Sequence, residues 1–472
     1  MLTTTNPSET FVNDVHSRLN PSWVREIVRP RSIESLQAGM RHARANNLSI
    51  SSAGARHAMG GQQFGAGTLH LDLTGLDRIL DFDAARGLVE VEAGIMWPQL
   101  VSGILAAQGD APAPWTIAQK QTGADRLTLG GAVSANIHGR GLTMRPFVTD
   151  IESVTVVRAD GEVVRCDRQE NFDLFRLVVG GYGLFGVIYS VTLRLVPRRK
   201  MQRIVEIIAI DEVMPAFESR IRDGFVYGDF QYMTDERSPD YLRRGVFACY
   251  RPISNDTPMG PNQRELGKDD WRKLIHLSHV DKSAAYQHYT AHYRATSGQI
   301  YWSDLMQMST YIDDYHREID TATCARVPGS EMITEIYVPR AMLAEFMRDV
   351  AADFLRHGVN VIYGTVRLIE RDTESFLAWA REPWACVIFN LHVDHTPAGL
   401  LDAADAFRRL IDLAMAYHGS YYLTYHKFAT PGQVVACHPR FAEFLREKQH
   451  HDPETRFRSD WYDHYARQFH NR

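Results

Sequence analysis

Two glycine-rich segments in the first third of the chain each carry a histidine. Residues 50–72 (ISSAGARHAMGGQQFGAGTLHLD) contain His57, and residues 121–141 (QTGADRLTLGGAVSANIHGRG) end with Asn136 and His138. Glycine lets the main chain approach a ligand closely. Two such loops between predicted strands indicate one extended ligand lying across both. The alternatives are a solvated surface histidine in the first segment and a buried helix start of small residues in the second.

A third glycine-rich stretch, GGYGLFG at 180–186, satisfies the GxGxxG pattern through Gly181, Gly183 and Gly186. The dinucleotide fingerprint requires a helix after the glycines, because the helix N-terminus binds the pyrophosphate. Residues 187–197 (VIYSVTLRLVP) instead alternate like a strand. We therefore exclude a Rossmann motif, while a nucleotide-contacting turn of another fold remains open.

Polar and ionisable residues recur inside four apolar strand candidates of the second half. The strand candidates are 335–339, 360–369, 385–394 and 420–426. Their polar residues are Glu335, Arg367, Asn390, His392 and His426. Each alone is more often a hydrogen-bonded structural residue. Five of them on neighbouring strands indicate the floor of a pocket.

Helices and strands alternate in an order that predicts an α+β fold. In the first half we expect a helix from Ser32, a strand at 88–93, a helix at 98–108 and a hairpin over 151–166 that turns at Asp160-Gly161. In the second half, helical stripes at 341–357 and 400–418 end at glycines. Residues 452–465 form a polar, aromatic tail that we expect to dock on the body.

Length and composition narrow the class of protein. A chain of 472 residues suggests two or three domains, and its net charge of -5 argues against nucleic acid as a partner. Five cysteines without a CxxC pair predict neither a zinc site nor a disulfide framework, and we expect no metal. The N-terminus has no secretory pattern, and no apolar run approaches the ~20 residues of a transmembrane helix. We expect a cytoplasmic protein.

The N-terminal part resembles the PCMH-type FAD-binding domain of the vanillyl-alcohol oxidase superfamily. The matching segments, in the family's order, are 29–44, 52–62, 71–76, 89–100, 128–141 and 180–188. The remainder resembles the sugar-oxidising branch, which includes decaprenylphosphoryl-ribose oxidases, alditol oxidases and cytokinin dehydrogenases. Its matches are EIYVP, NLHVD and YLTYHK.

The resemblance implies FAD as cofactor and a two-subdomain FAD-binding domain over 1–196. It implies a substrate-binding cap with an antiparallel sheet over 197–426, and a C-terminal segment, 427–472, that returns to the FAD domain. The residues expected to contact FAD are Ala53, Gly54, Ala55, Arg56, His57, Ala58, Met59, Gln62, Gly123, Thr128, Gly130, Gly131, Ser134, Asn136, His138, Gly139, Gly186 and Ile188.

His57 is expected to form a covalent link to FAD. Cytokinin dehydrogenases attach the flavin to a histidine in the pattern His-Ser-x-x-Gly-Gln, and this chain reads His-Ala-Met-Gly-Gly-Gln over 57–62. The decaprenylphosphoryl-ribose branch lacks that histidine. Residues 117–131 contain no cysteine, so the resemblance implies one link at most.

The resemblance also implies oxidation of an alcohol group of a sugar, polyol or other small hydroxylated molecule. Hydride would pass to flavin N5, and O2 or another acceptor would reoxidise the flavin. We expect His426 or His392 to act as base, and Asn390 to contact the substrate. Arg367 would stabilise an alkoxide or bind an acidic group, and Glu335 would order a hydroxyl. The alternatives are a C=C reductase of the sterol-reductase type and a non-catalytic FAD-binding protein.

Overall fold

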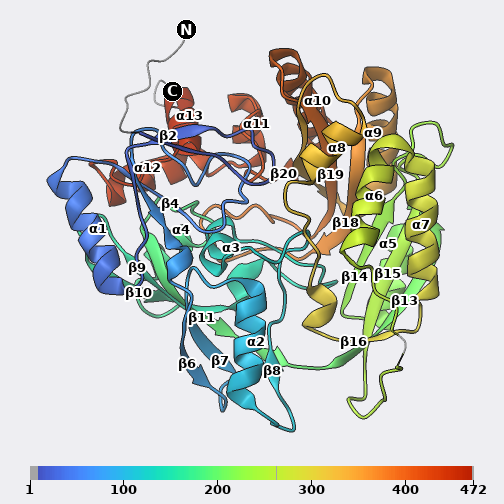
Figure 1. Ribbon diagram of the computed structural model, residues 1–472, viewed down its shortest axis with the longest axis horizontal. Coiled ribbons are helices and arrows are strands. Elements are labelled where there is room, and N and C mark those ends of the chain that lie inside the picture. The colour runs from blue at the N-terminus through green and yellow to red at the C-terminus, as the bar shows by residue number, and fades with distance from the viewer. Residues whose placement is uncertain (1–8, 262, 470–472) are drawn as a thin grey trace.

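The computed structural model describes residues 9–261 and 263–469, which form a mixed helix and sheet fold. Figure 1 shows the N-terminal elements, in blue and cyan, on one side and a large sheet with its helices on the other. The mixed architecture agrees with the predicted α+β class.

Small sheets build the N-terminal side. β1 (Thr10–Val12) pairs with β2 (Ser22–Val24), and β8 (Trp115–Thr116) pairs with β12 (Val196–Pro197). A parallel sheet has the order β3 (Glu26–Val28), β5 (Leu69–Asp72), β4 (Ile50–Ala53). Helix α1 (Ile33–Ala45) begins after Ser32, as predicted, and buries Leu36 and Met40 against this sheet.

A five-stranded antiparallel sheet follows in the sequence. Its central strand begins directly after the glycine-rich stretch at 180–186 and therefore tests the rejected Rossmann motif. The sheet has the order β10 (Val163–Asp167), β9 (Ile151–Val157), β11 (Val187–Arg194), β7 (Leu88–Glu92), β6 (Ile79–Asp83). The predicted hairpin over 151–166 is confirmed by the β9–β10 pairing. Strand β11 directly follows GGYGLFG, so the exclusion of a Rossmann motif is also confirmed. The helices of this part are α2 (Trp97–Gln108), α3 (Leu129–Ala135) and α4 (Phe172–Val178).

An eight-stranded antiparallel sheet dominates the other side. Its order is β16 (Ile300–Trp302), β13 (Lys200–Ala209), β15 (Arg244–Ile253), β14 (Tyr227–Tyr232), β18 (Val361–Ile369), β19 (Trp384–Asp394), β17 (Gly329–Pro339), β20 (Ser420–Tyr421). One face packs against α5 (Ile210–Arg222), α9 (Leu343–His357) and α10 (Pro397–Ala416). Helices α6 (Lys268–Val280) and α7 (Lys282–Ala295) contact strands of the same sheet, and α8 (Tyr315–Ala322) contacts β17.

The register of β17 and β19 sorts the polar residues between the two faces of this sheet. Glu331 lies opposite His392, Ile333 opposite Asn390, and Glu335 opposite Ile388. Side chains alternate along a strand, so these pairs share one face. The intervening residues, including Met332 and Ile336, belong to the core beneath the helices.

The strand predicted over 420–426 is shorter than expected. β20 ends at Tyr421, and Tyr422, Thr424 and Tyr425 turn away to line a cavity. The Tyr422 amide still donates to the Glu335 carbonyl at 3.0 Å, but the chain then leaves the sheet. His426 therefore does not lie on a strand.

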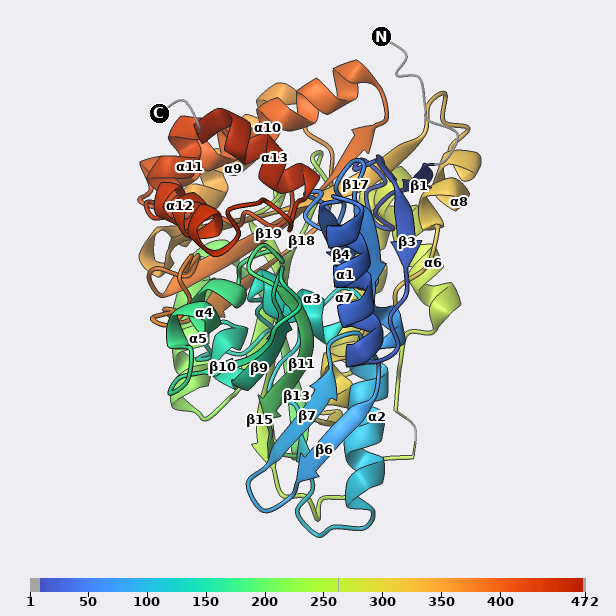
Figure 2. The same cartoon turned by 90° about the vertical axis from the view of Figure 1, so that its left-hand side faces the viewer.

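The C-terminal segment lies against the N-terminal elements. The Ile50 amide donates to the Arg456 carbonyl at 2.6 Å, and the Arg458 amide donates to the Ile50 carbonyl at 2.9 Å. Figures 1 and 2 show the helices of this segment, in red, next to the blue N-terminal strands. These helices are α11 (Pro431–Cys437), α12 (Phe441–His451) and α13 (Asp460–Phe469). None of the helices in the described part of the chain is long and apolar enough to cross a membrane.

Asn136 joins segments that are far apart in sequence, which predicts an effect on stability. Its amide nitrogen donates to Asp372 at 2.9 Å, its amide oxygen accepts from the Val148 main chain, and its carbonyl accepts from Trp379 Nε1. We expect Asn136→Ala to lower the free energy of unfolding by about 2–4 kcal/mol, because buried partners lose their hydrogen bonds. Urea denaturation measures this.

Asn171 provides the matched control for that experiment. It also adopts the left-handed conformation, with φ of 50° against 47° at Asn136, and donates to the Arg165 carbonyl, but it is exposed. We expect Asn171→Ala to cost about 1 kcal/mol or less. Equal losses for the two variants would contradict the role given to the buried network.

Candidate active site

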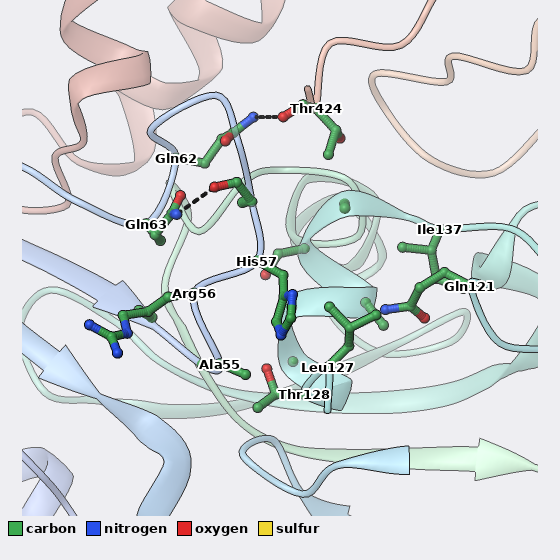
Figure 3. Close-up of a pocket in the computed structure, with 18 of the residues that line it drawn as sticks. Ala55, Arg56, His57, Gln62, Gln63, Gln121, Leu127, Thr128, Ile137 and Thr424 are labelled. Atoms are coloured by element: carbon green, nitrogen blue, oxygen red, sulfur yellow. Dashed lines mark hydrogen bonds between the residues drawn. The ribbon is translucent and has the colours of Figure 1, made fainter. Parts of the chain in front are cut away.

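A cavity of about 240 Å³ lies where the glycine-rich segments meet. Tyr422, Thr424, Tyr425 and Ile333 close it on the side of the large sheet. Figure 3 shows His57 between the loop that carries Gln62 and the start of α3 at Leu127 and Thr128. The predicted FAD-contacting residues that line the cavity are Ala53, Gly54, Ala55, Arg56, His57, Ala58, Met59, Gln62, Gly123, Thr128, Gly130, Gly131, Ser134, Gly186 and Ile188.

Close main-chain packing shapes this cavity. A Cβ at Gly54 would lie 1.9 Å from Thr128 Oγ1, and a Cβ at Gly130 would lie 2.9 Å from Ala93 Cβ. Arg56, immediately before His57, has a φ of 61°, a conformation that is uncommon outside glycine. The two loops are thus held together by contacts that leave no room for further side-chain atoms.

His57 presents an unpaired nitrogen inside the cavity. Among the described residues, its buried Nδ1 has no hydrogen-bond partner, and its ring packs edge-on against Tyr311 with centroids 5.4 Å apart. Burial, and then the neighbouring His16, lowers the pKa of His57 to about 4. The imidazole is therefore neutral at neutral pH. A cavity with glycine-lined walls and a free imidazole lone pair is chemically suited to a flavin dinucleotide.

The other predicted FAD-contacting residues, Asn136, His138 and Gly139, lie behind the cavity lining. The Gly139 amide donates to Gln119 at 3.1 Å, and Asn136 makes the hydrogen bonds described above. His138 Nε2 lies 2.7 Å from the Glu335 carboxylate. These side chains support the wall from outside and connect it to β17.

Glu335 is the centre of a buried polar group on the sheet face. It contacts His138 and accepts a hydrogen bond of 2.7 Å from Tyr337. Burial alone would raise its pKa, but His138 and the surrounding hydrogen bonds bring the pKa below its ordinary value of 4.5. Tyr425 lines the cavity, and burial together with the charge of Glu335 raises the pKa of this phenol. A carboxylate and a phenol thus meet at the cavity wall.

Arg367 and Asn390 carry unpaired polar atoms on the same face. Within the described residues, neither Arg367 Nε nor Asn390 Oδ1 has a hydrogen-bond partner, although both are buried. Arg367 also donates to Thr122, and Asn390 pairs across the strands with Ile333; both of these partners line the cavity. One free donor and one free acceptor are therefore next to the cavity.

The two histidines predicted as alternative bases lie elsewhere. His426 Nε2 is 3.2 Å from the hydroxyl of Thr334, on the face covered by α10, and its ring stacks on Phe407 of that helix. Burial lowers the pKa of His426 to about 3. His392 Nδ1 is 3.1 Å from the Glu331 carboxylate, which raises the pKa of His392. Neither side chain lines the cavity, and we move the role of base to another residue below.

Sequence reasoning missed Tyr425 and Glu331. Tyr425 was within reach, because it directly precedes His426 in the YLTYHK segment. Glu331 lies at the start of β17, before the segment in which polar residues were sought. Its position four residues before Glu335, on the same face of a strand, was the available signal.

Comparison with known proteins identifies the cofactor. Residues 24–167 match the family model of the FAD binding domain. The chain is 31% identical over 191 residues to an oxidoreductase of the fasciation locus of Rhodococcoides fascians. The aligned segment covers 40% of this chain and 41% of that protein. FAD, predicted from the resemblance, is thereby confirmed as the cofactor. The match spans less than half of the length of that relative.

Two further relatives match more of the chain at lower identity. Cytokinin dehydrogenase 4 of Oryza sativa subsp. japonica is 24% identical over 366 residues, 71% of this chain and 64% of that protein. Decaprenylphosphoryl-beta-D-ribose oxidase of Mycolicibacterium smegmatis is 23% identical over 440 residues, 90% of this chain and 91% of the oxidase. The resemblance to these groups, drawn above from the motifs, is confirmed.

The contact between Gly54 and Thr128 predicts a loss of cofactor. Gly54→Ala forces the two loops apart, because the new Cβ would overlap Thr128 Oγ1. We expect the purified variant to hold less than about a tenth of the FAD of the native protein, since a shift of about 1 Å is costly in a preorganised site. The ratio of flavin to protein absorbance measures it.

Gly260→Ala is the control, because nothing lies within 4 Å of a Cβ at that position. Circular dichroism verifies that both variants are folded. A Gly54→Ala protein with full flavin content would show that the two loops can separate without loss of the site.

Proposed function

We propose that this FAD-binding protein oxidises an alcohol group of a small hydroxylated molecule and that His57 bonds covalently to the flavin. The observation that carries the proposal is the continuity of the cavity. Its glycine-lined walls reach from His57 to Tyr425, beside the face with Glu335, Arg367 and Asn390. Cofactor-binding and substrate-binding chemistry therefore adjoin each other. The names of the relatives, an oxidoreductase, a dehydrogenase and an oxidase, support the same reaction class.

Alcohol oxidation requires a proton acceptor near the hydroxyl and an acceptor for the hydride. FAD, when bound, supplies the hydride acceptor. Glu335 takes the hydroxyl proton through Tyr425, the cavity-lining phenol next to it. The low pKa of Glu335 keeps it ionised, and therefore able to accept a proton, throughout the neutral range.

Arg367 and Asn390 orient the substrate. The free Nε of Arg367 donates a hydrogen bond to a substrate oxygen, and its positive charge stabilises an alkoxide as the proton leaves. The free Oδ1 of Asn390 accepts from a second substrate hydroxyl. A molecule with more than one oxygen, such as a sugar or polyol, satisfies both groups.

The tether depends on the state of His57. Only a neutral imidazole has a lone pair that can form a bond to carbon. The bond would replace one hydrogen of a flavin methyl group: one proton would leave from that group and one from the ring, and the electron pair would reduce the flavin, to be taken up by O2 or another acceptor. Burial provides this state by lowering the pKa of His57, and its Nδ1 is not engaged by a protein group. We further infer that 1–196 and 427–472 form the FAD-binding part, with 197–426 as cap, because the C-terminal segment is hydrogen-bonded to β4.

We expect flavin to remain with the precipitate when the native protein is denatured in acid, and to be released by His57→Ala. Flavin fluorescence of the pellet and supernatant measures this. His42→Ala, which replaces an exposed histidine of α1, is the control and should keep its flavin in the pellet.

Because the pKa of His57 is about 4, the extent of attachment should stay constant from pH 5.5 to 8. Complete release from the native protein would rule out the bond.

Glu335→Gln should slow flavin reduction by substrate about 10²- to 10⁴-fold, because the amide cannot accept the proton. Sugars, alditols, lactones and aromatic alcohols are first screened by hydrogen peroxide release and by dye reduction. Stopped-flow absorbance then measures the variant with the best substrate. Glu345→Gln, on the exposed side of α9, is the control and should match the native rate. An unchanged rate for Glu335→Gln would exclude Glu335 as proton acceptor, and reduction of C=C substrates alone would contradict the reaction class.

A further inference from the structure

Three histidines surround a second buried carboxylate, outside the cavity lining. Glu331 Oε1 lies 2.7 Å from His279 Nε2 and 3.1 Å from His392 Nδ1. Glu331 Oε2 lies 2.8 Å from His316 Nδ1 and accepts a hydrogen bond from Tyr315. The residues come from α6, α8, β17 and β19, so four separate elements converge on one side chain.

The outer nitrogens of two of these rings are already engaged by main-chain carbonyls. His279 Nδ1 lies 2.8 Å from the Ile275 carbonyl, and His316 Nε2 lies 2.8 Å from the His16 carbonyl. A carbonyl only accepts, so each outer nitrogen carries a hydrogen. In a neutral ring the inner nitrogen then carries a lone pair, which points at a carboxylate that also only accepts.

With Glu331 ionised, the contacts of His279 and His316 are attractive in two cases: the rings are protonated, or a cation lies between a ring and Glu331. The first case places two imidazolium ions, His279 and His316, around one carboxylate, while His392 can donate from Nδ1 as a neutral ring. The side chains of Glu331, His279 and His316 are only 2%, 6% and 6% exposed, so one positive charge in excess would be held almost out of water. Such a charge excess is costly to bury. The nearest additional acid of the described residues at His392 is Asp394, which is 57% exposed.

A divalent cation with the carboxylate also leaves one positive charge, but direct bonds to the carboxylate oxygen and to neutral imidazole nitrogens offset the cost of burying it. Neutral imidazoles coordinate it through their inner nitrogens, and the carbonyl that holds His279 Nδ1 is a usual support for a metal-binding histidine.

We propose that His279 Nε2, His392 Nδ1 and Glu331 Oε1 bind a divalent transition-metal ion of the Zn²⁺ type. Two imidazoles and a carboxylate form a ligand set that suits such ions. The three ligand atoms lie within 4.8 Å of one another. Bonds of about 2.1 Å in a tetrahedron would place them about 3.4 Å apart, so small side-chain movements suffice. Tyr315 donates to the other carboxylate oxygen, which His316 also contacts, and one coordination position is left for water or another oxygen donor.

The proposed metal site lies beside the cavity but does not depend on the flavin residues. Glu331 is two residues from the cavity-lining Ile333 on the same strand face, a separation of about 7 Å. The carbonyl that holds His316 belongs to His16, another lining residue. No ligand itself lines the cavity. The expectation of no metal rested on cysteine spacing, which cannot reveal ligands spread over residues 279–392.

Metal binding by the full-length flavoprotein tests the proposal. After chelator treatment and gel filtration, the native protein should bind about one Zn²⁺ per chain in a competition titration with a chromophoric chelator. Co²⁺ should give visible absorption bands of a protein-bound ion. His279→Ala and His392→Ala should each weaken Zn²⁺ binding by more than about tenfold, with FAD content unchanged.

His288→Ala provides the matched control, because His288 is an exposed histidine of the neighbouring helix α7. It should bind Zn²⁺ like the native protein. Native protein that binds no stoichiometric Zn²⁺ or Co²⁺ would overturn the proposal in favour of protonated histidines around Glu331. Equal affinity in His279→Ala and the native protein would overturn it as well.

Discussion

The close approach of two glycine-bearing segments is the constraint on which the rest of the structure depends. Gly54 follows β4 and meets Thr128 at the start of α3, without space for a Cβ. Because neither segment fills the space with its own side chains, main-chain groups form the wall of the cavity. The parallel sheet, α3 and the turn before β11 are the supports that keep this wall in place. His57 gains its chemical character from the same packing, since burial in the wall keeps its ring neutral.

The second determinant is the two-residue period of the large sheet. It assigns Glu331, Glu335 and Asn390 to the face toward the cavity, and Thr334 to the face under α10. His426, bonded to Thr334, is thereby separated from Glu335 by the thickness of the sheet. A motif match along the sequence does not show this separation, because residues a few positions apart can lie on opposite faces of the sheet.

Sequence patterns predicted the elements whose structure depends on neighbouring residues in the chain. The Asp160-Gly161 turn, the Ser32 cap and the alternation after Gly186 predict β9–β10, α1 and β11 correctly. The end of β20 could not be predicted, because Tyr422 to Tyr425 have strand-like side chains and leave the sheet only to meet the cavity. The partners of Glu331 were equally inaccessible, since their proximity is created by the packing of α6 and α8 near β17.

Glu331 and Glu335 are the same residue type on the same strand face, but their surroundings suit the two different functions that we propose for them. Both are buried, and contacts lower the pKa of each despite burial. Glu335 has one histidine, His138, and a cavity-lining phenol that connects it to the cavity, an arrangement suited to receiving a proton. Glu331 is enclosed by three histidines. No cavity-lining side chain connects it to the cavity, so it is not placed to receive a proton from a substrate there. Because imidazole nitrogens surround its carboxylate, Glu331 is suited to holding a cation. The four-residue separation along β17 keeps the two proposed functions apart.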